Sequence, residues 1–386
     1  ATFTAVSGEG YFCNTTAGSF TVNLPTSPSV GDIVSIKDYA RTFDSNSLTV
    51  GRGGSNMDGN AADTNFSTEG ASLTLIYMDA TKGWSLINDD ATGETGASFV
   101  TATGGSISNS PCGNFKIHTF TGPGTFCVTC GGNSQGSNTV SYMIVAGGGG
   151  GGTGCSHGAG AGAGGFRESK ASSDCYTASP LNATSGPTYN IPVSVQGYPV
   201  VVGAGGTGAQ DSSPKFGADG NTSSAFGISS AGGGAGGGWN NSAGRNGGSG
   251  SGSACSPSPT SVGSGNTPPV SPPQGNNGGG ATGARMGGGG GAGEAGNTDG
   301  QGQGGDGATT SISGSPTAYA GGGSAGGSTP PSPLPGGDGG GGFGAGPPSP
   351  VGGDATANTG GGGGGSFNSC QVAGNGGSGI VIIRYK

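Results

Sequence analysis

Charged and aromatic side chains are scarce in this chain of 386 residues. Charged residues make up 8% of the sequence and aromatic residues 6%, and the only histidines are His118 and His157. Lys and Arg number 12 against 20 Asp and Glu, which gives a formal net charge of −8. A protein that binds nucleic acid needs a basic stripe, and the sequence has none. We therefore expect no nucleic-acid partner.

Long apolar runs and catalytic residue clusters are also missing. No stretch of about eighteen apolar residues occurs, so no membrane-spanning helix is predicted. Cys155 and His157 are close in sequence, but no third residue is present to orient them as a nucleophile and base. The acidic residues are too sparse to assign a catalytic carboxylate pair, and the histidines do not form a His-x-His metal motif. We therefore expect no enzyme activity, no metal site and no cofactor.

Glycine instead dominates the chain, and it does so unevenly. There are 97 Gly and 23 Pro, and only 17 of the glycines lie in residues 1–130. Residues 147–165 contain almost nothing larger than alanine and cannot form a hydrophobic stripe, which excludes an amphipathic helix or an ordinary strand. A glycine inside an α-helix also costs about 1 kcal/mol relative to alanine.

Two alternatives remain for such a segment: disorder, or an extended left-handed helix with three residues per turn. Such a helix has no internal hydrogen bonds, so its backbone groups need partners on neighbouring helices, which glycine allows to approach closely. Further runs of this kind occupy residues 203–208, 231–238, 278–293, 320–327, 336–346 and 360–365. We predict a bundle of polyglycine type II helices with exposed loops over residues 147–378, and essentially no α-helix.

The rest of the chain has the pattern of short β-strands. Residues 1–90 predict an all-β module, with alternating runs at 2–6, 19–24, 33–36, 48–50, 73–77 and 84–87. Residues 91–113 are polar and are expected to be a linker. Residues 114–146 predict further strands, and 379–386 a terminal one. Because glycines cannot bury its apolar side chains, we expect residues 380–385 to pair with 139–146 and to clamp the bundle.

The eight cysteines are an even number, at positions 13, 112, 127, 130, 155, 175, 255 and 370. A glycine lattice buries little apolar surface, and disulfides would compensate by constraining the unfolded chain. Cys127 and Cys130 have the spacing of half a zinc site, but no second pair follows. We therefore expect disulfides, without a pairing assigned, and an oxidising, extracellular setting.

Several segments resemble known families. The sequences HTFTGPGTFCV at 118–128, SYMIVAGGGGGG at 141–152 and GGSGIVIIRYK at 376–386 resemble the glycine-rich terminal domain of phage tail-fibre and receptor-binding proteins. The segment YFCNTTAGSFTVNLPTSPSVGDIVSIKDYARTF at 11–43 resembles repeated β modules in tail fibres of marine and cyanobacterial phages. The glycine-rich part is also similar to the polyglycine sandwich of T-even-type fibre-tip adhesins.

The resemblance implies a virion tail fibre, located outside the cell, whose loops recognise the host bacterium. The implied partners are a bacterial surface glycan or outer-membrane protein and other tail-fibre or baseplate proteins, and the implied assembly is a homotrimer. The alternative function is a structural subunit of an extracellular filament or sheath.

Aromatic and cationic side chains lie between the glycine runs, where a lattice has no structural use for them. Rigid amphipathic rings suit recognition of glycans or proteins. The receptor-binding candidates are Tyr176, Tyr189, Trp239, Arg245 and Tyr319. We expect the loop at 166–198, and Trp239, to lie at the end of the bundle far from the sheet. The alternative is that these rings cover the bundle or pack against neighbouring protomers.

Overall fold

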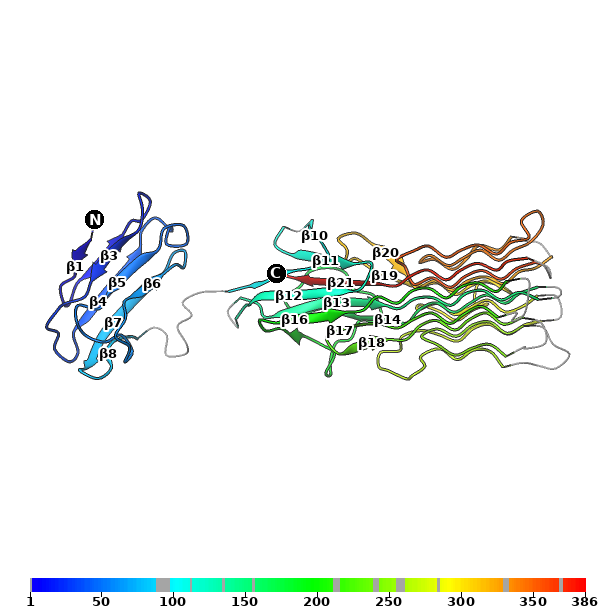
Figure 1. The fold of residues 1–386 in the computed structure, drawn as a ribbon, viewed down its shortest axis with the longest axis horizontal. Helices are drawn as coiled ribbons and strands as arrows, with labels where there is room; N and C mark the ends of the chain where they lie inside the picture. Colours follow the sequence, from blue (N-terminus) through cyan, green and yellow to red (C-terminus); the bar gives the residue numbers. More distant parts are fainter. Residues whose placement is uncertain are drawn as a thin grey trace. The chain divides into compact units, whose positions relative to one another are not determined.

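The structure is a computed structural model and contains two compact units, each described here by itself (Figure 1). It describes residues 2–87, 98–111, 113–133, 136–154, 157–210, 216–238, 243–254, 261–282, 285–328, 333–367 and 371–386. Unit 1 comprises residues 1–98 and 134–136, and unit 2 comprises 99–133 and 137–386. Within the described ranges no α-helix occurs, which confirms the prediction of an all-β chain, and no helix long and apolar enough to cross a membrane is found.

Unit 1 is built from two four-stranded sheets that share one core. The first has the order β1 (Phe3–Thr4), β3 (Phe20–Asn23), β5 (Leu48–Gly51), β6 (Thr64–Phe66). The second has the order β2 (Gly10–Cys13), β4 (Ile33–Asp38), β7 (Ser72–Asp79), β8 (Gly83–Leu86). Alternate side chains from both sheets, with Trp84 fully buried among them, form a single apolar cluster. The sequence pattern predicted six of these strands and missed β2 and β6.

The last strand of the chain lies in the middle of the central sheet of unit 2. Its order is β10 (Ser106–Asn109), β11 (Lys116–Phe120), β21 (Ile380–Tyr385), β13 (Thr139–Val145), β14 (Phe166–Ser169). β21 pairs antiparallel with β13, from Val145 opposite Ile380 to Ser141 opposite Arg384. The predicted pairing of residues 380–385 with 139–146 is therefore confirmed. Because β21 has a strand on each side and cover on both faces, all six of its residues are buried.

A second, three-stranded sheet covers one face of the central sheet. It consists of β16 (Gly197–Val200), β12 (Gly124–Gly131) and β9 (Val100–Thr103), while β15 (Ile191–Pro192) pairs antiparallel with the start of β13 in the central sheet. Side chains such as Phe126 and Val128 of this sheet pack against Tyr142 and Ile383 of the central one. Two hairpins complete the strands: β17 (Ser223–Ala225) with β18 (Ile228–Ser230), and β19 (Ala308–Thr310) with β20 (Thr317–Tyr319).

The linker expected over residues 91–113 is wrong for residues 100–109. These residues form β9, which pairs with β12, and β10, which pairs with β11. The polar composition predicted a linker here because few apolar residues mark these strands. Thr101 and Thr103 face solvent, and the four residues of β10 are all exposed. Residues 88–97 lie outside the described ranges.

The glycine runs bond to their neighbours with a period of three, and Figure 1 shows them side by side. The six N–H groups of residues 147–152 donate to three runs in turn. Gly147 and Gly150 donate to 221 and 218, Gly148 and Gly151 to 377 and 374, and Gly149 and Gly152 to 162 and 159. The six carbonyls of the same residues accept from three further runs, at 206–209, 233–236 and 363–366. Successive N–H groups and carbonyls thus bond to six different runs, so six neighbours surround the run.

Glycine is required where these runs approach one another. A Cβ added at Gly149 would overlap the carbonyl oxygen of Gly234, and one added at Gly150 would overlap that of Thr207. The neighbouring backbone cannot move aside without breaking the hydrogen bonds that hold it. Ala159, Ala161 and Ala163 are fully buried in the same lattice, so a methyl group fits only at particular positions of a run.

The runs alternate in direction between two ends of the lattice. Gly149 bonds Gly162 and Gly152 bonds Ala159, so residues 147–154 lead away from the sheets and 157–165 lead back. We call the end next to the sheets the sheet end, and the other, which contains Gly158 bonded to Ser366 and Gly326, the loop end.

The segment at 147–165 thus contains two runs, where one outgoing run was expected. The loop at 166–198 consequently starts at the sheet end, and its strands β14 and β15 pair with β13. The expectation that this loop lies far from the sheet is wrong.

Candidate recognition surfaces

Two of the five predicted receptor-binding residues are core residues. Tyr176 and Tyr319 are 6% and 5% exposed, so the expectation that their rings project from loop tips is wrong. They pack with Met143 of β13 and with Ile380 and Ile382 of β21. One face of the central sheet carries these apolar side chains, and glycine runs have no side chains to cover them. The loop that carries Tyr176 and the β19–β20 hairpin that carries Tyr319 supply that cover instead.

The other three predicted residues lie apart from one another. Tyr189 is half-buried at the sheet end, where the carbonyl of Thr188 accepts a hydrogen bond of 3.0 Å from the Tyr142 hydroxyl. Arg245 is exposed on the lattice and its Nη1 lies 3.1 Å from Asp219 Oδ2. Trp239 lies outside the described residues. In the part of the chain that the structure describes, only Tyr176 and Tyr319 of the predicted residues share a cluster, and that cluster is buried.

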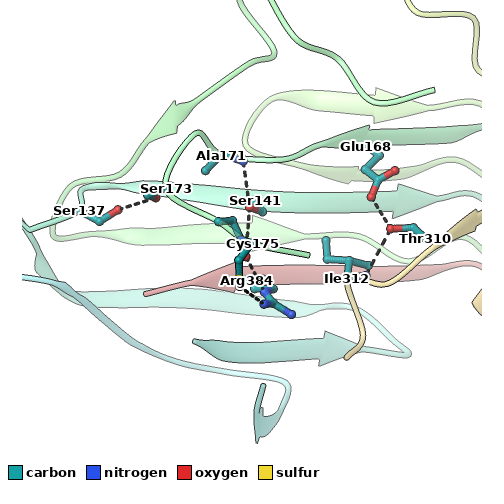
Figure 2. A network of polar contacts seen from close by, with 10 residues as sticks. Ser137, Ser141, Glu168, Ala171, Ser173, Cys175, Thr310, Ile312 and Arg384 are labelled. Carbon is teal, nitrogen blue, oxygen red and sulfur yellow. Dashed lines mark hydrogen bonds and ion pairs between the residues drawn. The ribbon is translucent and has the colours of Figure 1, made fainter. Parts of the chain in front are cut away.

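A buried polar network holds the loop at 166–198 on the central sheet (Figure 2). Arg384 Nε donates to Asp174 Oδ1 at 3.0 Å, and the Ser141 hydroxyl donates to Asp174 Oδ2 at 2.8 Å. Ser141 in turn accepts from the backbone N–H of Ala171 at 2.9 Å. The Arg384 guanidinium also lies over the ring of Tyr176, 5.2 Å from its centroid. Every charge in this network has a partner, which is the condition for burying it.

Glu168 forms a second part of the same network. It is 2% exposed, and its two carboxylate oxygens accept hydrogen bonds from the hydroxyl of Thr310 and the N–H of Ser179. Burial raises the pKa of the Tyr176 phenol, and the neighbouring Glu168 carboxylate raises it further. Thr310 belongs to β19, so this contact ties the later hairpin to the first loop. We assign the network a structural role.

His118 lies in another buried polar contact, which joins the central sheet of unit 2 to the three-stranded sheet. Its Nδ1 lies 2.7 Å from the carbonyl oxygen of Gly104, which can only accept, so Nδ1 carries the proton. Nε2 then accepts from the Tyr385 hydroxyl at 3.0 Å, and that hydroxyl accepts from the N–H of Ala102 at 3.1 Å. Burial lowers the pKa of His118, which keeps the ring neutral. The histidine is a fully bonded core residue.

Exposed apolar side chains gather at the loop end of the lattice. Phe343, Val351 and Val372 are 41%, 42% and 38% exposed. Their backbones are neighbours, because the N–H of Gly353 donates to Phe343 and that of Gly352 donates to Val372. The half-buried rings of His157 and Phe367 lie 5.5 Å apart, and Phe367 bonds to the carbonyl of Pro350 beside Val351.

We call His157, Phe343, Val351, Phe367 and Val372 the loop-end patch. Sequence reasoning missed it because its members come from five separate runs. The one available signal was that Phe343 interrupts a glycine run at 336–346.

The carboxylates of Glu294, Asp299 and Asp306 lie within 4.8 Å of one another. Burial raises the pKa of Glu294, and its Oε1 accepts from the backbone N–H of Asp306 at 3.2 Å. No further observation points to an ion at these carboxylates, so we assign no metal to them.

The described cysteines correct the expectation of disulfides at two positions. Cys13 is a buried free thiol of unit 1, and Cys127 is an exposed free thiol on β12. Burial raises the pKa of Cys13 to about 11, and the nearby Asp38 carboxylate adds to that shift. Cross-linking is not needed at these sites because side-chain packing stabilises unit 1 around Cys13, and β12, which carries Cys127, pairs with both β9 and β16. Cys112, Cys155, Cys255 and Cys370 lie outside the described residues.

Unit 2 is a glycine lattice. The strand that leads into it, β13, and the strand that follows it, β21, pair in one sheet. The family model for the glycine-rich domain, Gly_rich_2, matches residues 121–386, and the chain belongs to this family. A comparison with curated proteins finds no match.

Proposed function

We propose that this chain is a phage tail-fibre or receptor-binding protein that recognises a bacterial surface through the loop end of its lattice. The loop-end patch carries the proposal, because it places exposed apolar groups at the end of the lattice opposite its sheets. A run such as 147–152, bonded to six neighbours, has little freedom to move. A rigid scaffold lowers the entropy lost when its surface binds a partner.

The resemblance of the strand sequences at 118–128 and 376–386 to tail-fibre domains supports the same proposal. The proposed partner is a glycan or outer-membrane protein of the host bacterium, bound without chemistry. Assembly as a homotrimer on the virion, with other fibre or baseplate proteins, is part of the proposal.

The test is binding of the fluorescently labelled full chain to a panel of bacterial isolates that includes cyanobacteria. We expect the chain to label some isolates, and Phe343→Ser combined with Phe367→Ser to abolish labelling without unfolding unit 2. Val201→Ser is the matched control, since Val201 is 45% exposed at the sheet end. Trp239→Ala tests the remaining predicted aromatic residue.

Two outcomes would contradict the proposal. Equal labelling by the double variant and the control would remove the loop-end patch from recognition. Labelling of no isolate, together with filaments of the purified chain in electron micrographs, would favour the alternative of an extracellular filament or sheath subunit.

A further inference from the structure

Unit 2 contains a cavity at its sheet end, separate from the loop-end patch. Its volume is about 570 Å³, within the usual range for sites that bind small molecules. Six of the lining residues carry the argument: Phe99, Asn109, Asn114, Phe115, Lys116 and Lys386. They come from the start of the unit, from β10, β11 and the segment between these strands, and from the residue that follows β21. We call this cavity the Lys116 pocket.

The charges of the pocket favour an anion. Lys116 and Lys386 both line it, and none of its described lining residues is acidic, although acidic residues outnumber basic ones in the whole chain. The Lys386 ammonium lies 5.3 Å from the centroid of the Phe99 ring, which holds this charge at the wall. Lys116 is exposed and sits opposite Tyr385 in the register of β11 and β21. Both ammonium groups are therefore available to a carboxylate.

The remaining wall suits a ring that bears hydroxyl groups. Phe99 is 36% exposed, so its ring offers an apolar surface to the face of a sugar. Asn109 and Asn114 are exposed, and within the described residues their side-chain amides make no hydrogen bond. Each amide offers two N–H donors and a carbonyl acceptor, which match sugar hydroxyls.

We propose that the Lys116 pocket binds an acidic saccharide, with the carboxylate at the two lysines, the sugar ring against Phe99 and hydroxyls at the asparagine amides. This site is separate from the loop-end patch and goes beyond the proposed function. The pocket and the patch lie at opposite ends of the lattice, so each proposal can fail without the other.

The experiment is isothermal titration calorimetry of the full chain with glucuronate, glucose and inorganic phosphate. We expect glucuronate to bind, glucose to bind at least about tenfold more weakly, and Lys116→Gln to weaken glucuronate binding by a similar factor. Lys82→Gln in unit 1 removes the same charge elsewhere and should change nothing. Asn114→Ala, another exposed position, gives a second variant whose binding should fall.

Three results would overturn the proposal. Equal binding of glucose would show that the lysines do not select an acid. Full competition by phosphate at equal concentration would reduce the pocket to a general anion site. Unchanged glucuronate affinity in folded Lys116→Gln and Asn114→Ala would place binding elsewhere.

Discussion

Arg384 on the last strand and Asp174 in the first loop form an ion pair of 3.0 Å in which both side chains are 1% exposed. The two residues are 210 positions apart, so the pair connects the loop that follows the first two runs to the last strand of the chain. A second ion pair in unit 2, between Arg245 and Asp219, has a similar distance of 3.1 Å but leaves both side chains about half exposed. The two pairs therefore differ chiefly in burial.

We expect Asp174→Asn to destabilise unit 2 by about 3–5 kcal/mol, because it removes the buried carboxylate charge that pairs with the Arg384 guanidinium. Asp219→Asn removes the same charge from the exposed pair and should cost about 0–1 kcal/mol. Urea unfolding followed by a probe of unit 2 measures both values. Similar small losses in the two variants would mean that the lattice holds the sheet without the buried pair.

The positions of individual glycines give a sharper test of the lattice. We expect Gly149→Ala to destabilise unit 2 by about 1–3 kcal/mol or more, because its methyl group would overlap the Gly234 carbonyl oxygen. Gly280→Ala is the matched control: among the described residues its Cβ would meet only Val262 Cγ1, at 3.9 Å, so stability should stay the same or rise slightly. Thermal unfolding of the two variants decides the matter, and equal midpoints would exclude close packing at Gly149.

Thiol labelling tests the assignment of Cys13 and Cys127 as free cysteines. In the folded chain an alkylating reagent should modify Cys127, which is exposed, and should spare Cys13, which is 2% exposed and has its pKa raised to about 11. Thiolate is the reactive form, so burial and the raised pKa both slow Cys13. Peptide mass spectrometry after labelling, with and without denaturant, reads out each site. A disulfide-linked peptide containing Cys127 would contradict the assignment.

Much of this architecture was predictable because two elementary constraints act on the sequence. Glycine runs have no side chains to bury, so their backbone groups must bond to other runs, which 147–152 do with six neighbours. The apolar strand at 380–385 needs a partner, and β13 was the one available with comparable hydrophobicity. Both inferences depend on local composition alone.

The placement of the loops was not predictable from composition. Residues 147–154 and 157–165 run in opposite directions, but no proline or charged residue separates them in the sequence. The segment therefore looked like a single run, and the loop at 166–198 was assigned to the wrong end. Tyr176 and Tyr319 looked like exposed rings because the face they cover is formed by strands far away in sequence. The loop-end patch and the Lys116 pocket likewise join residues from separate segments. Such sites depend on the order in which the runs pack, and composition gives no information about that order.

The buried His118 makes the stability of unit 2 depend on pH. Burial lowers the pKa of His118, whereas in the unfolded chain the value is about 6.5. As the pH falls through about 6.5, the unfolded chain binds a proton that the folded ring does not yet take up, so the free energy of unfolding decreases. The contribution of His118 is therefore fully present above that pH and is lost as the pH falls towards the folded value. Urea unfolding at about pH 7.5 and about pH 5.5 brackets the start of this window.

Substitutions separate His118 from the other groups whose pKa values are shifted. His118→Gln should lower stability at neutral pH, where it disrupts the bonds to Gly104 and Tyr385, and should reduce the loss on acidification. Tyr385→Phe retains the titrating ring and should retain most of the pH dependence. His157 also has its pKa lowered by burial, so His157→Gln measures its separate share. Asp38 of unit 1 affects stability at lower pH than the histidines do. Burial opposes ionisation of its carboxyl group, but hydrogen bonds from backbone N–H groups outweigh burial and lower the pKa of Asp38. An unchanged pH dependence in His118→Gln would show that the buried ring is not the group that titrates.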